Sequence, residues 1–283
     1  MNVRQVRKKI KSVVNVRKIT KAMQLISAIK MKRAQAMAVD GRPYQNDLAA
    51  VIKKVVSQVD VKHSSLLTSA EKSQKELVIV ITSNKGMCGA FNFNLFRMLS
   101  KSMDIRNSDF ITVGKKGTSF IFRMGGTIIA DYSSSTPLQS ISALFDLSLR
   151  KFLEGEYHSV SLFYNRFIST LVHEPTKETI LPIRINVEEQ KNSELIREYL
   201  IEPSPEKILD FLLKSFVEER IQDALIQSDA GEQSARMMAM KNATENANDV
   251  IYNLTLLRNK LRQEKITSEL LDMITAKESV EAG

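Results

Sequence analysis

The last third of the chain contains almost no residue that would interrupt a helix. After Pro205 no proline follows, and Gly231 is the only glycine before the terminal one. Ser204 and Pro205 are typical of a helix start, with serine as the N-cap and proline in the first turn. The sequence therefore predicts one helix of about 70 residues, on the order of 100 Å long. Such a helix is longer than any domain that this chain could build around it.

A helix of this length needs a partner, and the N-terminal segment supplies one. Val3, Val6, Ile10 and Val13 recur at spacings of 3, 4 and 3, which is the pattern of a coiled-coil seam. The stripe is expected to continue through Ala22, Met23, Ile26, Ile29 and Ala34. On the C-terminal helix the matching apolar stripe is Ile208, Leu212, Ile221, Leu225, Met238, Ala243, Ala247, Val250, Leu254, Leu257 and Leu261. We expect the two ends to form an antiparallel coiled coil, with a break or kink near Arg42 caused by Gly41 and Pro43.

The middle of the chain has a different pattern. Short apolar runs rich in β-branched residues predict buried strands at 76–83, 109–114, 126–131, 159–165 and 179–185. Helical segments are expected at 91–103, 116–124 and 137–153. Alternating strands and helices indicate a mainly parallel sheet covered by helices. The expected organisation is α/β: an N-terminal coiled-coil helix at 1–60, an α/β domain at 75–195 and a C-terminal coiled-coil helix at 204–283.

The positive charge of the chain is concentrated at its start. Residues 1–42 contain 12 Lys and Arg against one acid, a net charge of +11, whereas the remainder has 29 against 31, a net charge of −2. The stretch KITKAMQLISAIKMKRAQ combines these charges with apolar residues. It could bind nucleic acid, lie on an anionic membrane or face an acidic protein surface. The absence of aromatic residues from 1–42 argues against nucleic acid.

The glycine-containing stretch TSNKGMCGAFN lies between a predicted strand and a predicted helix. Its spacing, Gly86-x-x-Gly89, matches neither common nucleotide-binding fingerprint, so a tight turn is the favoured interpretation. Cys88 is the only cysteine, which excludes an internal disulfide, and no histidine stands in a recognisable relation to it. His173 and Glu174 are interpreted as part of a polar loop. We therefore expect no catalytic residues, no metal and no cofactor.

Three motifs together resemble one family. RKITKAMQLISAIKMKRAQ, TSNKGMCGAFNFNLF and EQSARMMAMKNATENANDVIYNLTLLRNKLRQEKITSELLDMI are similar to the gamma subunit of F-type ATP synthases, in the same order and along the whole length. The resemblance implies a coiled-coil shaft with an inserted Rossmann-like domain that binds no nucleotide. It also implies a rotor that couples transmembrane ion flow to ATP synthesis or hydrolysis on the beta subunits, inside a ring of alpha and beta subunits.

The resemblance also assigns contact residues. Met23, flanked by Lys21 and Gln24, matches the methionine of the rotor–stator contact, and RQEKIT matches a C-terminal motif that meets the beta subunits. The rotor–stator contact is expected to comprise Lys21, Met23, Arg236, Arg262, Gln263 and Thr267. Tyr199 and Glu202 match the foot of the shaft, where the epsilon subunit and the c-ring are met.

The implied partners are the alpha, beta and epsilon subunits and the c-ring, with no nucleic acid. The start at Met1 favours a bacterial protein held peripherally on the cytoplasmic face of the inner membrane. Two alternatives stay open on the residues alone. One is a basic coiled-coil protein that binds nucleic acid, and the other is a Rossmann-type enzyme with a helical appendage.

Overall fold

The computed structural model describes residues 2–56, 59, 64–68, 73–134, 137–184, 201–202 and 204–281. The chain divides into two compact units. The first consists of Met1–Ser27 and Arg236–Gly283, and the second of Ala28–Ala235. Two long helices, α1 (Val3–Val56) and α5 (Pro205–Glu281), contribute residues to both units.

The second unit is built on a five-stranded sheet with the order β3-β2-β1-β4-β5. The strands are β1 (Glu76–Ile81), β2 (Ser108–Val113), β3 (Thr127–Asp131), β4 (Ser159–Phe167) and β5 (His173–Leu181). Neighbouring strands are parallel except β4 and β5, which form an antiparallel edge. The predicted mainly parallel sheet is thus confirmed. The central strand β1 is buried from Leu77 to Ile81, as its continuous apolar sequence requires.

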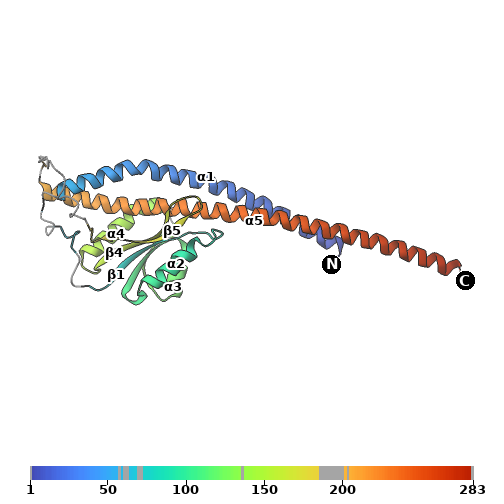
Figure 1. Ribbon diagram of the computed structural model, residues 1–283. Coiled ribbons are helices and arrows are strands. Elements are labelled where there is room, and N and C mark those ends of the chain that lie inside the picture. The colour runs from blue at the N-terminus through green and yellow to red at the C-terminus, as the bar shows by residue number, and fades with distance from the viewer. Residues whose placement is uncertain are drawn as a thin grey trace. The chain divides into compact units, whose positions relative to one another are not determined.

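Helices cover both faces of this sheet (Figure 1). One face carries α2 (Phe91–Ser102) and α3 (Lys115–Arg123), whose Leu95, Leu99 and Ile121 pack on Val78 and Val80 of β1. The other face carries α4 (Ile141–Leu153), the end of α1 and the first part of α5. The described part of the unit also contains two short 3-10 helices, Ile105–Asn107 and Pro137–Ser140.

The first unit is a two-helix coiled coil with a seven-residue repeat. On α1 the covered positions include 3, 6, 10, 13, 17, 20, 24 and 27, and on α5 they include 237, 240, 244, 247, 251, 254, 258 and 261. Thr20 and Thr244 share a hydrogen bond of 2.8 Å, and Arg17 donates to Asn248 at 3.1 Å. Residue numbers rise along one helix as they fall along the other. The helices are therefore antiparallel, as predicted.

Of the break or kink predicted near Arg42, the break is wrong, because α1 continues through Gly41 and Pro43 to Val56. A proline inside a helix removes one backbone hydrogen bond and crowds the preceding turn. Here the helix continues because Leu48 and Ile52, in the next turns, are buried in the core on the sheet. Tertiary packing thus outweighs the local cost.

Part of the predicted apolar stripe of α1 is also wrong. Ile26 and Ile29 are 55% and 70% exposed, and Ala22 is exposed as well, whereas Thr20 and Ser27 are buried. The seven-residue repeat places positions 6, 13, 20 and 27 in the seam. The first two are valines, and the next two are Thr20 and Ser27, which are polar. On α5 the same correction applies to Val250 and Leu257, which are exposed.

The segment around His173 and Glu174 is a strand, not the predicted polar loop. Its residues pair with β4 from Phe167–His173 to Val160–Leu181, so backbone pairing decides the structure although the sequence is polar. The strand predicted at 179–185 ends at Leu181. The Nδ1 atom of His173 is buried, and burial lowers the pKa of this side chain below its usual 6.5.

This lowered pKa of His173 predicts a pH-dependent stability. The folded chain keeps the ring neutral to a lower pH than the unfolded chain does, because the pKa of His173 is lowered from 6.5 by burial. The contribution of His173 is therefore fully present above pH 6.5 and decreases as the pH falls below that value. The unfolding midpoint of the wild type should fall more steeply between pH 7.5 and 5.5 than that of His173→Phe. Parallel pH profiles of the two proteins would contradict this assignment.

Among the described residues, no helix has an apolar stretch long enough to cross a membrane.

Candidate functional site

The glycine-containing turn after β1 is closed to a phosphate group by the chain's own atoms. Within the turn, the Ser83 amide donates to Asn92 Oδ1 at 3.1 Å, and Asn92 Nδ2 donates to Ser83 Oγ at 2.7 Å. The adjacent amides at the start of α3 are also occupied. Those of residues 115, 116 and 117 donate to Asn84 Oδ1, Ser83 O and Thr82 Oγ1. A helix start whose amides are taken offers no anion site.

Thr82 fills the space that a ligand would need at this edge of the sheet. A Cβ atom at Gly114 would lie 2.1 Å from the Thr82 carbonyl oxygen, and one at Gly117 would lie 2.8 Å from Thr82 Oγ1. The two glycines therefore allow close packing of β1 on the β2–α3 turn. This geometry supports the interpretation of the motif as a structural turn.

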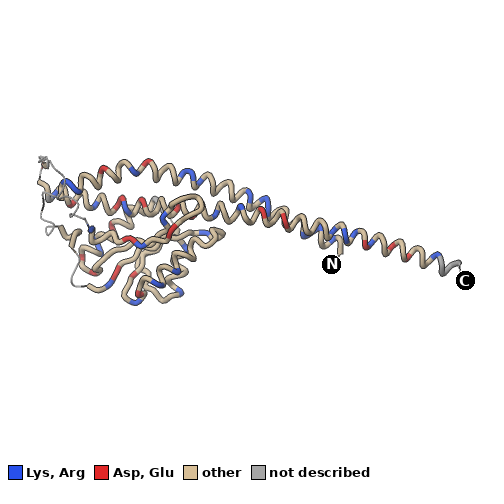
Figure 2. The backbone as a smooth tube through the Cα atoms, viewed as in Figure 1, with Lys and Arg blue, Asp and Glu red and all other residues tan. Residues whose placement is uncertain are grey.

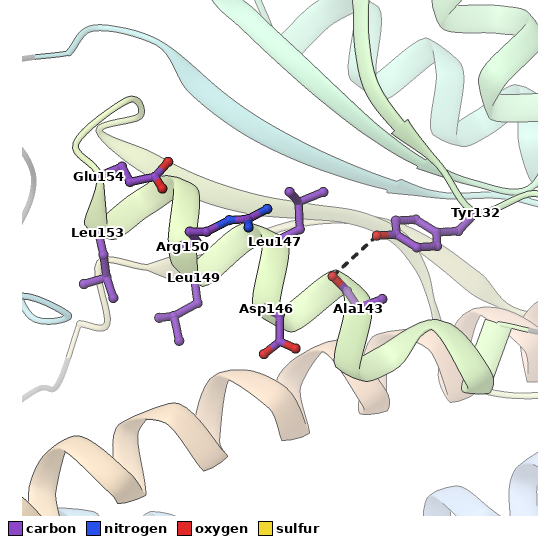
Figure 3. Close-up of a pocket in the computed structure, with 8 residues that line it drawn as sticks. All are labelled: Tyr132, Ala143, Asp146, Leu147, Leu149, Arg150, Leu153 and Glu154. Atoms are coloured by element: carbon purple, nitrogen blue, oxygen red, sulfur yellow. Dashed lines mark hydrogen bonds between the residues drawn. The ribbon is translucent and has the colours of Figure 1, made fainter.

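Away from this turn, described residues also line grooves on α4 and on the coiled coil. One, of ≈650 Å³, follows α4 and is lined by Tyr132 and by charged and aliphatic side chains of that helix (Figure 3). Tyr132 donates to the Ala143 carbonyl oxygen at its rim. Its charges, Asp146, Arg150 and Glu154, have mixed sign and are open to solvent. The described residues contain no group of three or more side chains suited to hold a metal ion.

The second groove lies in the coiled-coil unit and is strongly basic. It measures ≈580 Å³ and is lined by Arg17, Lys18, Lys21, Ala22, Leu25, Thr244 and Asn248. Figure 2 shows the Lys and Arg positions along α1. Ile19, Leu25 and Ile26 are each more than half exposed beside these cations. A surface that combines exposed aliphatic and basic side chains suits an acidic partner with an apolar contact.

The structure brings some of the predicted contact residues to this surface. Lys21 is exposed and donates to Gln24 at 3.3 Å, while Met23 is half-buried on the same turn of α1. Arg236 on α5 is only 7% exposed, so its guanidinium is covered by the chain itself. Lys21 and Met23 therefore belong to the accessible surface, whereas Arg236 does not.

The other predicted contact residues lie near the end of α5, where every described side chain from 262 to 277 is exposed. Arg262, Gln263 and Thr267 are among them. They are accompanied by the exposed aliphatic side chains of Ile266, Leu270, Leu271, Met273 and Ile274. A helix that presents so many apolar side chains to water is expected to be covered by a partner. Of the two predicted foot residues, Glu202 is exposed, and Tyr199 lies outside the described residues.

Sequence reasoning missed two features of these surfaces. The first is the polar layer of Thr20 and Thr244, which the strict seven-residue spacing from Val6 and Val13 could have revealed. The second is the exposed aliphatic side of the basic stretch, which was assigned to the seam. Its members, Ile26 and Ile29, fall on the helical period of 3.6 but off the repeat of seven.

The fold defines a class of protein in which the two terminal helices form a coiled coil and an α/β domain is inserted between them in the sequence. The family model of ATP synthase matches residues 2–280. The ATP synthase gamma chain of Akkermansia muciniphila is 36% identical, with 99% of each chain covered, and that of Coxiella burnetii is 35% identical, with 98% of this chain and 99% of the relative covered. The chain belongs to the ATP synthase gamma chain family.

Solved structures agree on the fold. A chain of the Euglena gracilis mitochondrial ATP synthase, from a structure of OSCP, F1 and the c-ring, aligns with a TM-score of 0.73 at 20% identity, covering 99% of this chain and 95% of that one. A chain of the rotor of the same enzyme aligns with a TM-score of 0.66 at 19% identity, covering 93% and 98%.

Proposed function

We propose that this chain is the central rotor shaft of an F-type ATP synthase. In this role it couples transmembrane ion flow to ATP synthesis or hydrolysis on the beta subunits, by rotation inside the alpha/beta hexamer. The observation that carries the proposal is the exposed aliphatic surface at the end of α5, together with the basic and aliphatic surface around Lys21. Family membership supplies the partners that would cover these surfaces.

The proposed mechanism is differential contact. The basic groove occurs on one side of the coiled coil, so a rotating shaft presents different side chains to each beta subunit at each angle. A contact that stabilises one conformation of a beta subunit over another by about 1–3 kcal/mol changes its affinity for nucleotide by about 5- to 150-fold. Rotation then alternates binding, reaction and release among the three beta subunits.

The chain itself is proposed to be non-catalytic. Its strand-end turn is filled by Thr82, Ser83 and Asn92, which favours a structural role for the sheet domain. The three proposed functional parts are the helix at 1–60, the Rossmann-like domain at 75–195 and the helix at 204–283. Tyr199 and Glu202 are proposed to meet the epsilon subunit and the c-ring. Through the ring, the chain would be held on the cytoplasmic face of the bacterial membrane.

Purification from membranes through a tag on this chain tests the proposal. We expect alpha, beta and epsilon subunits to be recovered with ATPase activity, and this activity to be lost when residues 262–283 are deleted. Recovery of the chain alone, or of nucleic acid in place of these subunits, would overturn the proposal.

A substitution at Met23 tests the contact more finely. Met23→Lys places a cation on the half-buried side of the basic surface, where it would alter the contact with each beta subunit. Since Met23 lies outside the fully buried seam, we expect a shift in stability within about 1 kcal/mol. The ratio of ATP-driven ion pumping to hydrolysis should fall at least about threefold, an effect within the usual range of coupling energies. Met23→Leu is the control, and an equal loss of pumping and hydrolysis would refute the assignment.

A further inference from the structure

The proposed function gives no role to the turn TSNKGMCGAFN, although hydrogen bonds between Ser83 and Asn92 fix its conformation. We propose that this turn and the β4–β5 hairpin form a docking joint that receives the Gly231–Ala235 segment of α5. Cys88, Phe91 and Ala235 form a small buried cluster of their own, separate from the two larger cores. The residues of this joint are positioning residues, since they hold α5 in place and are not proposed to contact a substrate.

Gly231 is the centre of the joint. A Cβ atom at this position would lie 3.2 Å from Phe91 Cε2, 3.6 Å from His173 Cβ and 3.8 Å from the Asn165 carbonyl oxygen. Glycine inside a helix costs about 1 kcal/mol relative to alanine. It is the only glycine of α5, and at this position the helix packs against Phe91 and the β4–β5 hairpin. The close approach accounts for a residue that the helix itself disfavours.

Polar contacts complete the joint. Ser234 Oγ donates to the Thr170 carbonyl oxygen at 2.5 Å, which ties α5 to the β4–β5 connection. Asn165 Nδ2 donates to the Phe91 carbonyl oxygen at 3.2 Å, which ties the hairpin to the start of α2. The rings of Phe91 and His173 are 5.6 Å apart in a tilted arrangement. Three separate parts of the chain therefore meet at one point.

The joint can open without unfolding the sheet domain. The preceding part of α5 is held by the main core through Leu209, Leu213, Val217, Ile221 and Leu225. Gly231–Ala235 are the last residues of α5 within the second unit. If the chain is the rotor of the proposed function, the joint transmits force between the sheet domain and the Gly231–Ala235 segment of α5. A loosened joint is then expected to lower coupling while leaving assembly intact.

Cys88 reports the state of the joint directly, because its thiol is buried beside Ala235 and is the only one in the chain. The experiment measures the rate of maleimide labelling of the full-length chain at constant pH. In Gly231→Leu the larger side chain would push Phe91 away, and labelling should be at least tenfold faster than in the wild type. Lys214→Leu introduces the same residue at an exposed site of α5 and should label at the wild-type rate.

A milder variant covers the case in which Gly231→Leu fails to fold. Ser234→Ala removes one hydrogen bond, and its labelling should be about fivefold faster, equivalent to about 1 kcal/mol. If Cys88 is labelled at the wild-type rate in a folded Gly231→Leu variant, or in Ser234→Ala, the proposed joint is refuted.

The functional part is tested in the assembled enzyme. We expect Ser234→Ala to lower ion pumping relative to hydrolysis, with assembly unchanged. Faster labelling with full coupling would overturn the functional role and leave the contact itself in place. Failure of the wild-type chain to assemble would instead count against the proposed function, since the labelling result does not depend on any partner.

Discussion

Replacing Gly114 by alanine should cost the sheet domain about 4 kcal/mol or more, the largest effect on stability that we expect from a single methyl group. The position combines two constraints. Its φ of +102° is a region that L-residues rarely adopt, and a Cβ atom would lie 2.1 Å from the Thr82 carbonyl oxygen. The added methyl group would push β1 away from the β2–α3 turn, because the atom that it meets, the Thr82 carbonyl oxygen, belongs to the backbone and cannot rotate aside.

Substitutions at two other glycines distinguish the effect of the positive φ from the effect of the contact with Thr82. Gly125 has a φ of +75° with no atom within 4 Å of its Cβ position, and Gly86 has neither constraint. In urea unfolding, Gly125→Ala should cost about 1–2 kcal/mol, the price of the left-handed backbone alone. Gly86→Ala should be close to neutral. Equal destabilisation of Gly114→Ala and Gly125→Ala would show that the contact with Thr82 has no energetic role.

The second large effect is expected at the end of α5. Ile266, Leu270, Met273 and Ile274 recur at helical spacing and form one exposed aliphatic stripe. In the proposed rotor this stripe is covered by partner subunits. Leu270→Asp combined with Ile274→Asp would bury two carboxylates, each at a cost of several kcal/mol. The ATPase activity that co-purifies with the tagged chain should fall at least about tenfold, which corresponds to 1.4 kcal/mol.

The isolated chain should show no such effect, because both side chains are exposed in it. Its unfolding free energy should change by less than about 0.5 kcal/mol. Ser268→Asp combined with Thr275→Asp is the matched control, since it adds two carboxylates at exposed positions on the opposite side of the same helix segment. If this control lowers co-purifying activity as much as the variant with Leu270→Asp and Ile274→Asp, negative charge and not the aliphatic stripe is responsible.

The sheet domain could be predicted closely from the sequence because its signals are local. The run from Glu76 to Ile81 is apolar and β-branched, and a continuous apolar run of that length fits a buried strand. The first part of β5, from His173 to Glu178, escaped prediction because its pairing with β4 is a tertiary property. Lys177 and Glu178 of that strand find partners in Glu76 and Arg220, which are distant in the sequence.

The sequence was sufficient to predict that the two ends form a coiled coil. It was less sufficient to predict which residues are buried between the helices. Valines at 3, 6 and 13 identify the repeat, but at its next two positions, Thr20 and Ser27, the buried residues are polar. The apolar residues that attract attention there, Ile26 and Ile29, face outward. Exposed aliphatic side chains that lie beside one another suit contact with a partner, and the seam pattern of one chain does not distinguish them from its own buried residues.

The most direct test of the central claim is to watch this chain turn. Ser119 on α3 is exposed, so Ser119→Cys in a Cys88→Ser background gives one site for a visible probe on the sheet domain. The assembled ATPase would be immobilised through its beta subunits and supplied with ATP. The rotor account predicts continuous rotation of the probe in one direction. A probe that stays fixed while the same complexes hydrolyse ATP would contradict it.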